Sequence, residues 1–247
     1  MHRRFFVDRF DANSATLSGD SAEHLGRVLR AEPGQLCELS DGNSVWLGRI
    51  ERVALSKRGN NRIEFSLVEH IPAHESWLHL QLLIAIVKLD RFEWCLEKAT
   101  ELGVTEIVPL AAARTDKALV AAAGKRHARW EKIVFESAQQ SRRLRPPALS
   151  GERAAVRPAD AFAQSAAALK ILFSERREAR PLRDMLRGAK GSSVALAIGP
   201  EGGWTDDEIA TAKTSGFIET SLGENILRTE TAVLAALAIL RFALGAE

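Results

Sequence analysis

The sequence predicts an α/β protein whose larger part is a mostly parallel sheet, preceded by a small β-rich domain. From residue 78 onward, short apolar runs alternate with amphipathic segments, an order typical of a parallel sheet with helices on both faces. Before residue 70, short candidate strands are separated by turn residues and by a single short helical pattern. The stretch IPAHES at 71–76 has the composition of a linker, which predicts domains at 1–72 and 73–247.

The first domain is expected to hold three strands and one short helix. The clearest strand alternates, because Ile63, Phe65 and Leu67 fall on one face. In the helix, His24 and Arg27 are neighbours one turn apart, and Arg30 lies one step further, which makes a basic edge. By itself this half indicates only a small β domain. RNA binding is one of its candidate roles. The strands are expected at 4–7, 45–53 and 62–68, and the helix at 20–30.

The second domain shows clear helix signals after several apolar strands. Thr205 to Glu208 forms a capping box, in which the hydroxyl and the carboxylate satisfy the first backbone amides of a helix. The closing helix is apolar nearly all round, which indicates burial on more than one side, either in the core or at a dimer interface. Strands are expected at 78–87, 105–110, 169–173 and 194–198, and further helices at 90–103, 125–144, 181–187 and 229–244.

Two glycine-bearing loops follow strands of this domain. The first is GPEGG at 199–203, and the second is LGENILR at 222–228. Glycines let backbone amides approach a ligand closely, and ligands of open α/β sheets bind at the carboxyl ends of strands, where both loops fall. The loops therefore predict a pocket built mostly from backbone. The alternative is a pair of ordinary strand-to-helix turns.

Several classes of protein are disfavoured. Neither G-x-G-x-x-G nor G-x-x-x-x-G-K-[ST] occurs, so no dinucleotide or triphosphate site is indicated. Cys37 and Cys95 lie far apart and the histidines are scattered, so we expect no disulfide framework and no metal site. The longest apolar run is too short to span a bilayer and the N-terminus lacks a signal-like apolar region, so a cytoplasmic protein is expected.

The charge is unevenly distributed although its net value is only +2. Residues 114–145 hold nine Lys and Arg against three acids, and residues 170–190 hold seven against three. Residues 196–247 reverse the balance, with three against eight. A basic middle beside an acidic end favours a polyanion such as nucleic acid lying across one face, whereas solvated helix surfaces are the alternative.

The motifs IGPEGGW at 198–204 and SLGENILRTETA at 221–232 resemble the two C-terminal motifs of SPOUT-class RNA methyltransferases. The version with GPEGG and ILRTETA is similar to the RsmE family, which methylates N3 of a uridine in small-subunit ribosomal RNA. LDRFEWCLEKATELGVTEIVPL at 89–110 resembles the entry into that family's catalytic domain, and RRFFV with HLGRVLR resembles its PUA-like domain. The resemblance covers almost the whole chain.

The resemblance implies a trefoil-knotted SPOUT catalytic domain at 73–247 behind a PUA-like β-barrel at 1–72. It also implies a homodimer, S-adenosylmethionine as methyl donor, and the 16S ribosomal RNA of the small ribosomal subunit as substrate. The residues that it places at the donor are Leu172, Gly199, Gly203, Leu222, Gly223, Ile226 and Leu227. Those that it places at the RNA are Arg4, His24, Arg27, Arg30, Arg114, Gln140 and Arg143.

Methylation of uracil N3 requires that its proton leaves, so a base is needed, or a cation that stabilises the uracil anion. Arg228, at the rim of the expected pocket, is the candidate cation. Glu201 is the candidate base, and its alternative role is to cap nearby amides of the loop. Glu230 is expected to be structural in the first turn of its helix.

Two departures from the family pattern affect RNA contacts more than donor binding. Ala113 precedes Arg114 where an acidic residue is common, and Asn225 stands where a basic residue is common. Two other functions stay open at this point. One is a SPOUT enzyme that methylates a ribose 2′-hydroxyl, and the other is a non-catalytic RNA-binding factor in ribosome assembly.

Overall fold

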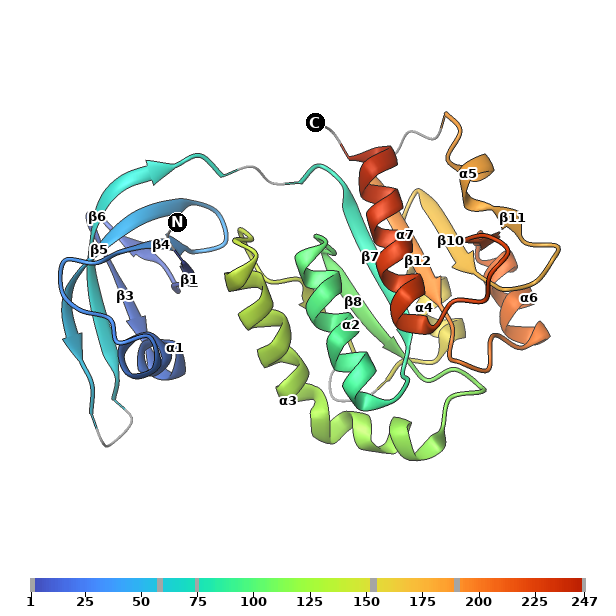
Figure 1. Cartoon of the computed structure of the whole chain (residues 1–247), viewed down its shortest axis with the longest axis horizontal. Helices are drawn as coiled ribbons and strands as arrows, with labels where there is room; N and C mark the ends of the chain where they lie inside the picture. The colour runs from blue at the N-terminus through green and yellow to red at the C-terminus, as the bar shows by residue number, and fades with distance from the viewer. Residues whose placement is uncertain (1–2, 57–59, 74–75, 152–154, 189–191, 246–247) are drawn as a thin grey trace. The chain divides into compact units, whose positions relative to one another are not determined.

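The structure is a computed structural model that describes residues 3–56, 60–73, 76–151, 155–188 and 192–245 (Figure 1). The chain divides into two compact units. The first comprises residues 1–75 together with 138–146, and the second comprises residues 76–137 and 147–247. None of the described helices is long and apolar enough to cross a membrane.

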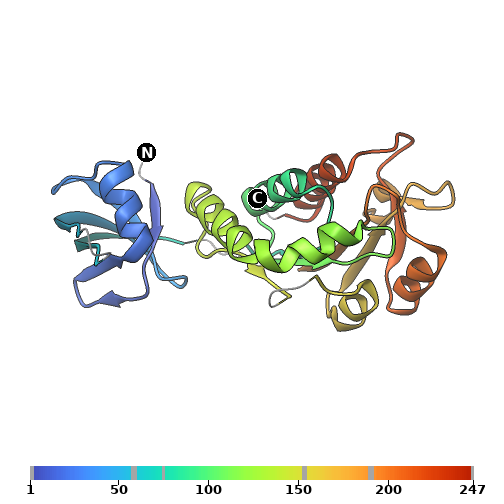
Figure 2. The ribbon, with the colours of Figure 1, turned by 90° about the horizontal axis from the view of Figure 1, so that it is seen from below.

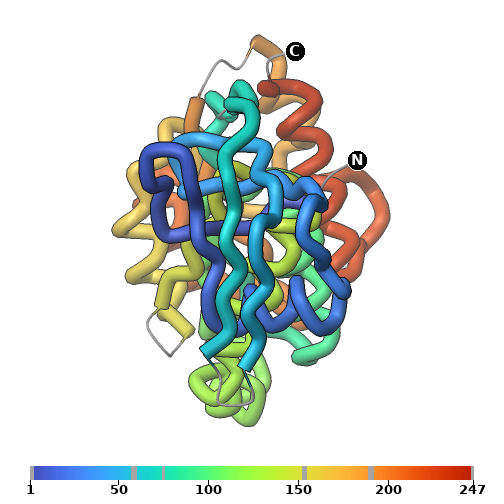
Figure 3. The backbone as a smooth tube through the Cα atoms, turned by 90° about the vertical axis from the view of Figure 1, so that its left-hand side faces the viewer, coloured from blue at the N-terminus to red at the C-terminus, as the bar shows by residue number. Residues whose placement is uncertain are grey.

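The first unit is a curled six-stranded sheet closed over an apolar interior. Its long strands β5 and β6 pair antiparallel and lie side by side (Figure 3). Phe5, Leu39, Ile50, Ile63 and Phe65 fill the interior, which confirms the inward face predicted for the strand that contains Ile63 and Phe65. The strands, in sheet order, are β1 (Arg4–Phe6), β4 (Leu36–Ser40), β5 (Val45–Ala54), β6 (Arg62–Ile71), β3 (Ser14–Ser18) and β2 (Phe10–Asp11).

The predicted helix of this unit is present, but only its first part is an α-helix. α1 (Gly19–Glu23) continues directly into a π-helix at His24–Val28. His24 and Arg27 on this segment are exposed, as is Arg30 just beyond its end, so the predicted basic residues face solvent. Arg27 pairs with Glu23 and donates to the carbonyl of Ser56.

Arg4 corrects the sequence prediction, which placed it at RNA. Its guanidinium is buried and donates twice to the Glu38 carboxylate, at 2.9 and 3.1 Å, and once to the carbonyl of Arg142 at 2.6 Å. Arg142 itself lies 3.4 Å from the other Glu38 oxygen. Arg4 therefore fastens β1 to β4 and to residues 138–146 and is not available to a phosphate.

The Arg4→Ala variant is expected to destabilise the first unit by about 3 kcal/mol, because it leaves the buried Glu38 carboxylate with much less compensation. Arg3→Ala, which removes the exposed neighbouring arginine, should change stability by no more than about 0.5 kcal/mol. Native-state hydrogen exchange of β4 and β5 amides measures both. Equal exchange rates in the two variants would contradict the structural role of Arg4.

The second unit is built on a seven-stranded sheet in which every described pair is parallel. The predicted parallel α/β architecture is thereby confirmed. The strands, in sheet order, are β11 (Arg180–Pro181), β13 (Ile218–Ser221), β10 (Leu169–Phe173), β12 (Ser193–Ile198), β7 (His79–Ala85), β8 (Glu106–Leu110) and β9 (Ala148–Leu149).

Helices cover both faces of this sheet (Figure 2). The central strands are apolar throughout, so alternate residues serve two cores: Leu82 and Ile84 face one, while Leu83 and Ala85 face the other. The first core packs against α2 (Leu89–Glu101), α3 (Lys117–Gln140), α5 (Leu182–Met185) and α7 (Thr229–Leu244), and the second against α4 (Pro158–Gln164) and α6 (Asp206–Thr214).

The position of α3 differs from the predicted helix at 125–144. It begins eight residues earlier, because Asp116 accepts the backbone N–H of Ala118 and caps the first turn. Gly124 is tolerated inside the helix. The helix ends at Gln140, and Arg142 follows with a φ of 55° that no helix continues.

Candidate functional site

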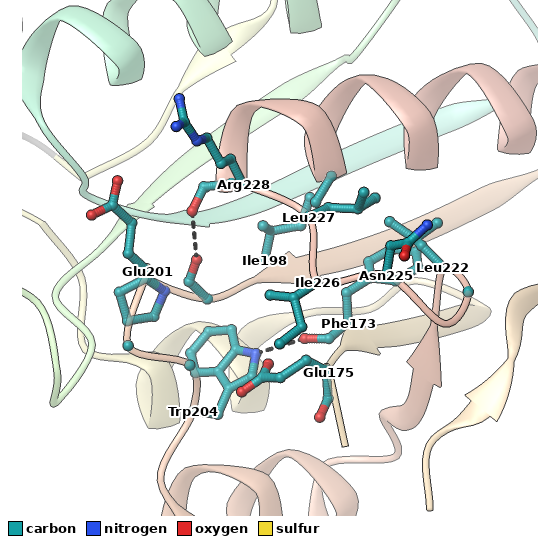
Figure 4. A pocket seen from close by; sticks show the side chains of 18 of the residues that line it. Phe173, Glu175, Ile198, Glu201, Trp204, Leu222, Asn225, Ile226, Leu227 and Arg228 are labelled. Atoms are coloured by element: carbon teal, nitrogen blue, oxygen red, sulfur yellow. Dashed lines mark hydrogen bonds between the residues drawn. The ribbon is translucent and has the colours of Figure 1, made fainter. Parts of the chain in front are cut away.

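Three loops at the carboxyl ends of β10, β12 and β13 enclose a pocket of about 530 Å³ (Figure 4). The two glycine-bearing loops predicted to meet do so, and the third loop, which follows Phe173, was not predicted. The lining residues are Arg91, Phe173, Ser174, Glu175, Ile198, Gly199, Pro200, Glu201, Gly202, Gly203, Trp204, Leu222, Gly223, Asn225, Ile226, Leu227, Arg228, Thr229 and Ala232.

The first loop is shaped by what its glycines allow. A Cβ on Gly199 would lie 3.0 Å from the ring of Trp204, which is buried and donates its Nε1–H to the carbonyl of Phe173 at 2.9 Å. Gly203 has a φ of +70°, which favours glycine. The predicted capping box at Thr205 and Glu208 is present and starts α6 directly behind the loop. The loop is therefore held from beneath and offers its backbone to the pocket.

The second loop returns the chain to the helix that closes the pocket. Gly223 has a φ of +138° and nothing lies within 4 Å of where its Cβ would be, so the backbone is open to the pocket. At the loop's end Thr229 donates to the carbonyl of Gly199 at 3.4 Å, which ties the two loops together (Figure 4). Ile226 is 81% exposed at the mouth, an unusual exposure for so large an apolar side chain.

One wall of the pocket carries an ion pair. Arg91, from the first turn of α2, bonds the Glu201 carboxylate and lies 3.8 Å from Glu230. Glu201 thus has a cationic partner, a structural contact that differs from both the base role and the amide-capping role expected from the sequence. Arg228 is exposed on the rim, and among the described residues its guanidinium has no hydrogen-bond or ion-pair partner.

The structure brings most of the predicted donor residues to this pocket. Leu172 is the exception, because it is not among the residues that line the pocket, and its side chain lies in the second core. Arg114 lies outside the lining but donates to the carbonyl of Gly202 at 2.7 Å, so it supports the first loop. Gln140 and Arg143 fall in the first unit, as do the three exposed residues of its basic edge.

Sequence reasoning missed Arg91 and Glu175. Both lie next to an element boundary that was predicted. Arg91 follows the predicted helix start at Asp90, and Glu175 lies two residues after the predicted strand end at Phe173. The rule that ligands bind beyond the carboxyl ends of parallel strands points to Glu175 once β10 is placed beside β12.

The two thiols are chemically quiet. Burial raises the pKa of Cys95 to about 12, with Glu230 adding to the shift, and burial raises the pKa of Cys37 to about 11. Thiols of this kind are protonated near neutral pH and are poor nucleophiles. No three His, Cys, Asp or Glu side chains of the described residues group as metal ligands would.

Comparisons with known proteins agree with this architecture. A family model described as RNA methyltransferase domain matches residues 74–241, and one described as RNA methyltransferase PUA domain matches residues 17–55. The ribosomal RNA small subunit methyltransferase E of Synechocystis is 34% identical over 91% of this chain and 72% of its own length. That of Bacillus subtilis is 30% identical over 97% and 96%.

Among solved structures, the ribosomal RNA small subunit methyltransferase E from Neisseria gonorrhoeae, bound to S-adenosyl methionine, matches with a TM-score of 0.85. The match has 31% identity and covers 99% of each chain. The parallel sheet, its three-loop pocket and the preceding barrel define an RNA methyltransferase of the SPOUT class with a PUA domain. Within that class, the chain belongs to the family of ribosomal RNA small subunit methyltransferase E.

Proposed function

We propose that this protein transfers a methyl group from S-adenosylmethionine to N3 of a specific uridine in the 16S ribosomal RNA of the small ribosomal subunit. The observation that carries the proposal is the likeness, over 99% of both chains, to a small-subunit methyltransferase E solved with S-adenosyl methionine bound. The choice of N3 rests on the resemblance of the GPEGG and ILRTETA motifs.

The residues of the pocket fit such a donor. Adenosine has polar edges that bind well to fixed backbone donors and acceptors. The backbone is accessible at Gly199, Gly203 and Gly223, where a Cβ would either clash with a neighbour or require a strained φ. The donor supplies a methyl group on a positively charged sulfur that is a good leaving group. The protein's task is therefore alignment, with the three loops holding the donor from three sides.

We assign the handling of charge at the reacting uracil to Arg228. Loss of the N3 proton leaves negative charge on the ring, and a guanidinium at the rim is free to bond a uracil oxygen and stabilise it. Glu201 is paired with Arg91, so we assign these two residues to holding the first loop against α2. The proton leaves to solvent at the exposed mouth of the pocket.

RNA contacts are proposed on both units. In the first, we assign phosphate contacts to the exposed His24, Arg27 and Arg30, with Gln140 and Arg143 at the end of α3. In the second, Arg114 lies beside the pocket loop and is exposed. Contacts of this kind fix the register of an RNA, and the target base must be splayed out of its fold to enter the pocket.

We further propose a homodimer through α7. This helix is mostly apolar and packs on α2. Two of its large apolar side chains are nevertheless exposed, Phe242 at 92% and Ile239 at 40%. On α2 itself Trp94 is 40% exposed. Large apolar side chains exposed on two packed helices are typical of a surface that another protein covers.

The proposed function is tested by methyl transfer from labelled S-adenosylmethionine to small ribosomal subunits taken from cells that lack the protein. The RNA is digested to nucleosides and analysed by mass spectrometry. We expect labelled 3-methyluridine. A labelled ribose-methylated nucleoside would identify the 2′-hydroxyl as acceptor, and absence of label on both subunits and naked RNA would favour the non-catalytic assembly factor.

A further inference from the structure

Glu175 is an exposed carboxylate on the wall of the pocket, and the described part of the chain provides no partner for it. It follows β10 and lines the pocket beside Gly203 and Trp204 (Figure 4). Among the described residues it makes no hydrogen bond and no ion pair, in contrast to Glu201 on the other wall. A Cβ at Gly203 would collide with its Oε1, so the carboxylate occupies the space that the glycine leaves.

The charges of the pocket are separated between its two sides. Arg228 and Glu201 lie on one side, whereas Glu175 lies on the other, close to Trp204 (Figure 4). Arg91 belongs to the Glu201 side, because it is bonded to that carboxylate. Both guanidinium groups that line the pocket therefore belong to the side opposite Glu175.

This separation decides which part of a donor Glu175 can hold. The amino-acid end of S-adenosylmethionine is a zwitterion, with a carboxylate that Glu175 would repel and an ammonium group. The opposite side, with Arg91 and Glu201, can pair both of these groups, whereas Glu175 could pair only the ammonium. The ribose offers two adjacent hydroxyl donors and no acidic group. A carboxylate that accepts both hydroxyls of a ribose is an established way to bind a nucleoside, and it uses both oxygens of one side chain.

Resting on the proposed function, we propose that Glu175 binds the ribose hydroxyls of the methyl donor and thereby sets its orientation in the pocket. The adenosine part lies on the Glu175 side, and the amino-acid part lies on the opposite side, toward Arg91 and Glu201. Glu175 is thus a donor-binding residue, and its role does not depend on RNA.

The test is calorimetric binding of three probes to the full chain and to Glu175→Gln. S-Adenosylmethionine carries the ribose, the amino acid and the sulfonium charge. S-Adenosylhomocysteine lacks the sulfonium charge, and 5′-methylthioadenosine lacks the charge and the amino acid while keeping the ribose. We expect Glu175→Gln to weaken all three by about tenfold, because each loses charge-assisted hydrogen bonds from the same hydroxyls.

Other patterns overturn the proposal. Weakening of S-adenosylmethionine alone would mean that Glu175 acts on the sulfonium charge. Weakening of the two amino-acid ligands, with 5′-methylthioadenosine unaffected, would mean that it binds the ammonium group. Unchanged affinity for all three would remove Glu175 from the site.

Two controls keep the result interpretable. Glu178→Gln removes an exposed carboxylate of the same segment that does not line the pocket, and it should leave all three affinities unchanged. Thermal unfolding checks that Glu175→Gln is folded. If the wild-type chain binds none of the probes, the proposed function fails; if it binds them and the variant pattern differs, only the assignment of Glu175 fails.

Discussion

Methyl transfer by the Arg228→Ala variant is expected to fall by about 100- to 1000-fold, while its affinity for the donor changes little. A group that stabilises charge formed in the transition state is worth this much when it is lost, and it contributes little to ground-state binding. Because Arg228 has no partner among the described residues, its removal breaks no ion pair in the fold.

Donor affinity by calorimetry and turnover with small ribosomal subunits separate these effects. Arg228→Lys is the matched control, because it keeps the charge but loses the planar fork that bonds a uracil oxygen, so turnover between the two extremes is expected. Unchanged turnover in Arg228→Ala would remove this residue from the mechanism, and a parallel loss of donor affinity would assign it to binding instead.

Gly223→Trp is expected to abolish donor binding, with an affinity at least about 100-fold weaker. Two causes add. A φ of +138° is a conformation that tryptophan resists, and strain of this kind costs about 1–3 kcal/mol. The open space in front of Gly223 is the pocket itself, so the indole would fill the volume that the donor needs. Calorimetry with S-adenosylmethionine measures the loss.

Gly216→Trp provides the matched control for strain alone. Gly216 is also exposed, also has a positive φ, of 85°, and has only Lys170 near its Cβ position, away from the pocket. This variant should lose a similar amount of stability and still bind the donor. Donor binding by Gly223→Trp at wild-type affinity would contradict the placement of the donor against this loop.

Local signals in the sequence determined much of the fold. The closing helix has the predicted bounds, Thr229–Leu244, because its apolar run is uninterrupted and the loop before it carries the turn residues. The first pocket loop was also predicted from local signals. Thr205 and Glu208 mark the start of a helix, and the glycines directly before them mark the loop that leads into it. These features depend on neighbours within a few residues.

Contacts between residues that are distant in the sequence were not predicted. Arg4 looks like any basic residue near a terminus, and its burial follows from Glu38 and from Arg142, which is 138 positions away. The sequence left Glu201 as a candidate base or as a carboxylate that caps loop amides, and its bond to Arg91, 110 positions away, was not foreseen. No periodicity in a single sequence records such pairings, because they join residues that only the tertiary fold brings together.

The segment 138–146 has a practical consequence for work with the N-terminal unit. Ser40 donates to the carbonyl of Leu144 at 2.6 Å, and Arg4 donates to that of Arg142. The barrel is therefore hydrogen-bonded to backbone carbonyls that lie more than a hundred residues later in the chain. A fragment excised at the linker after residue 75 would expose both donors and would lose the guanidinium of Arg142 beside Glu38. An expression fragment that retains this unit intact therefore has to be discontinuous, with 138–146 grafted behind the barrel by a designed connection.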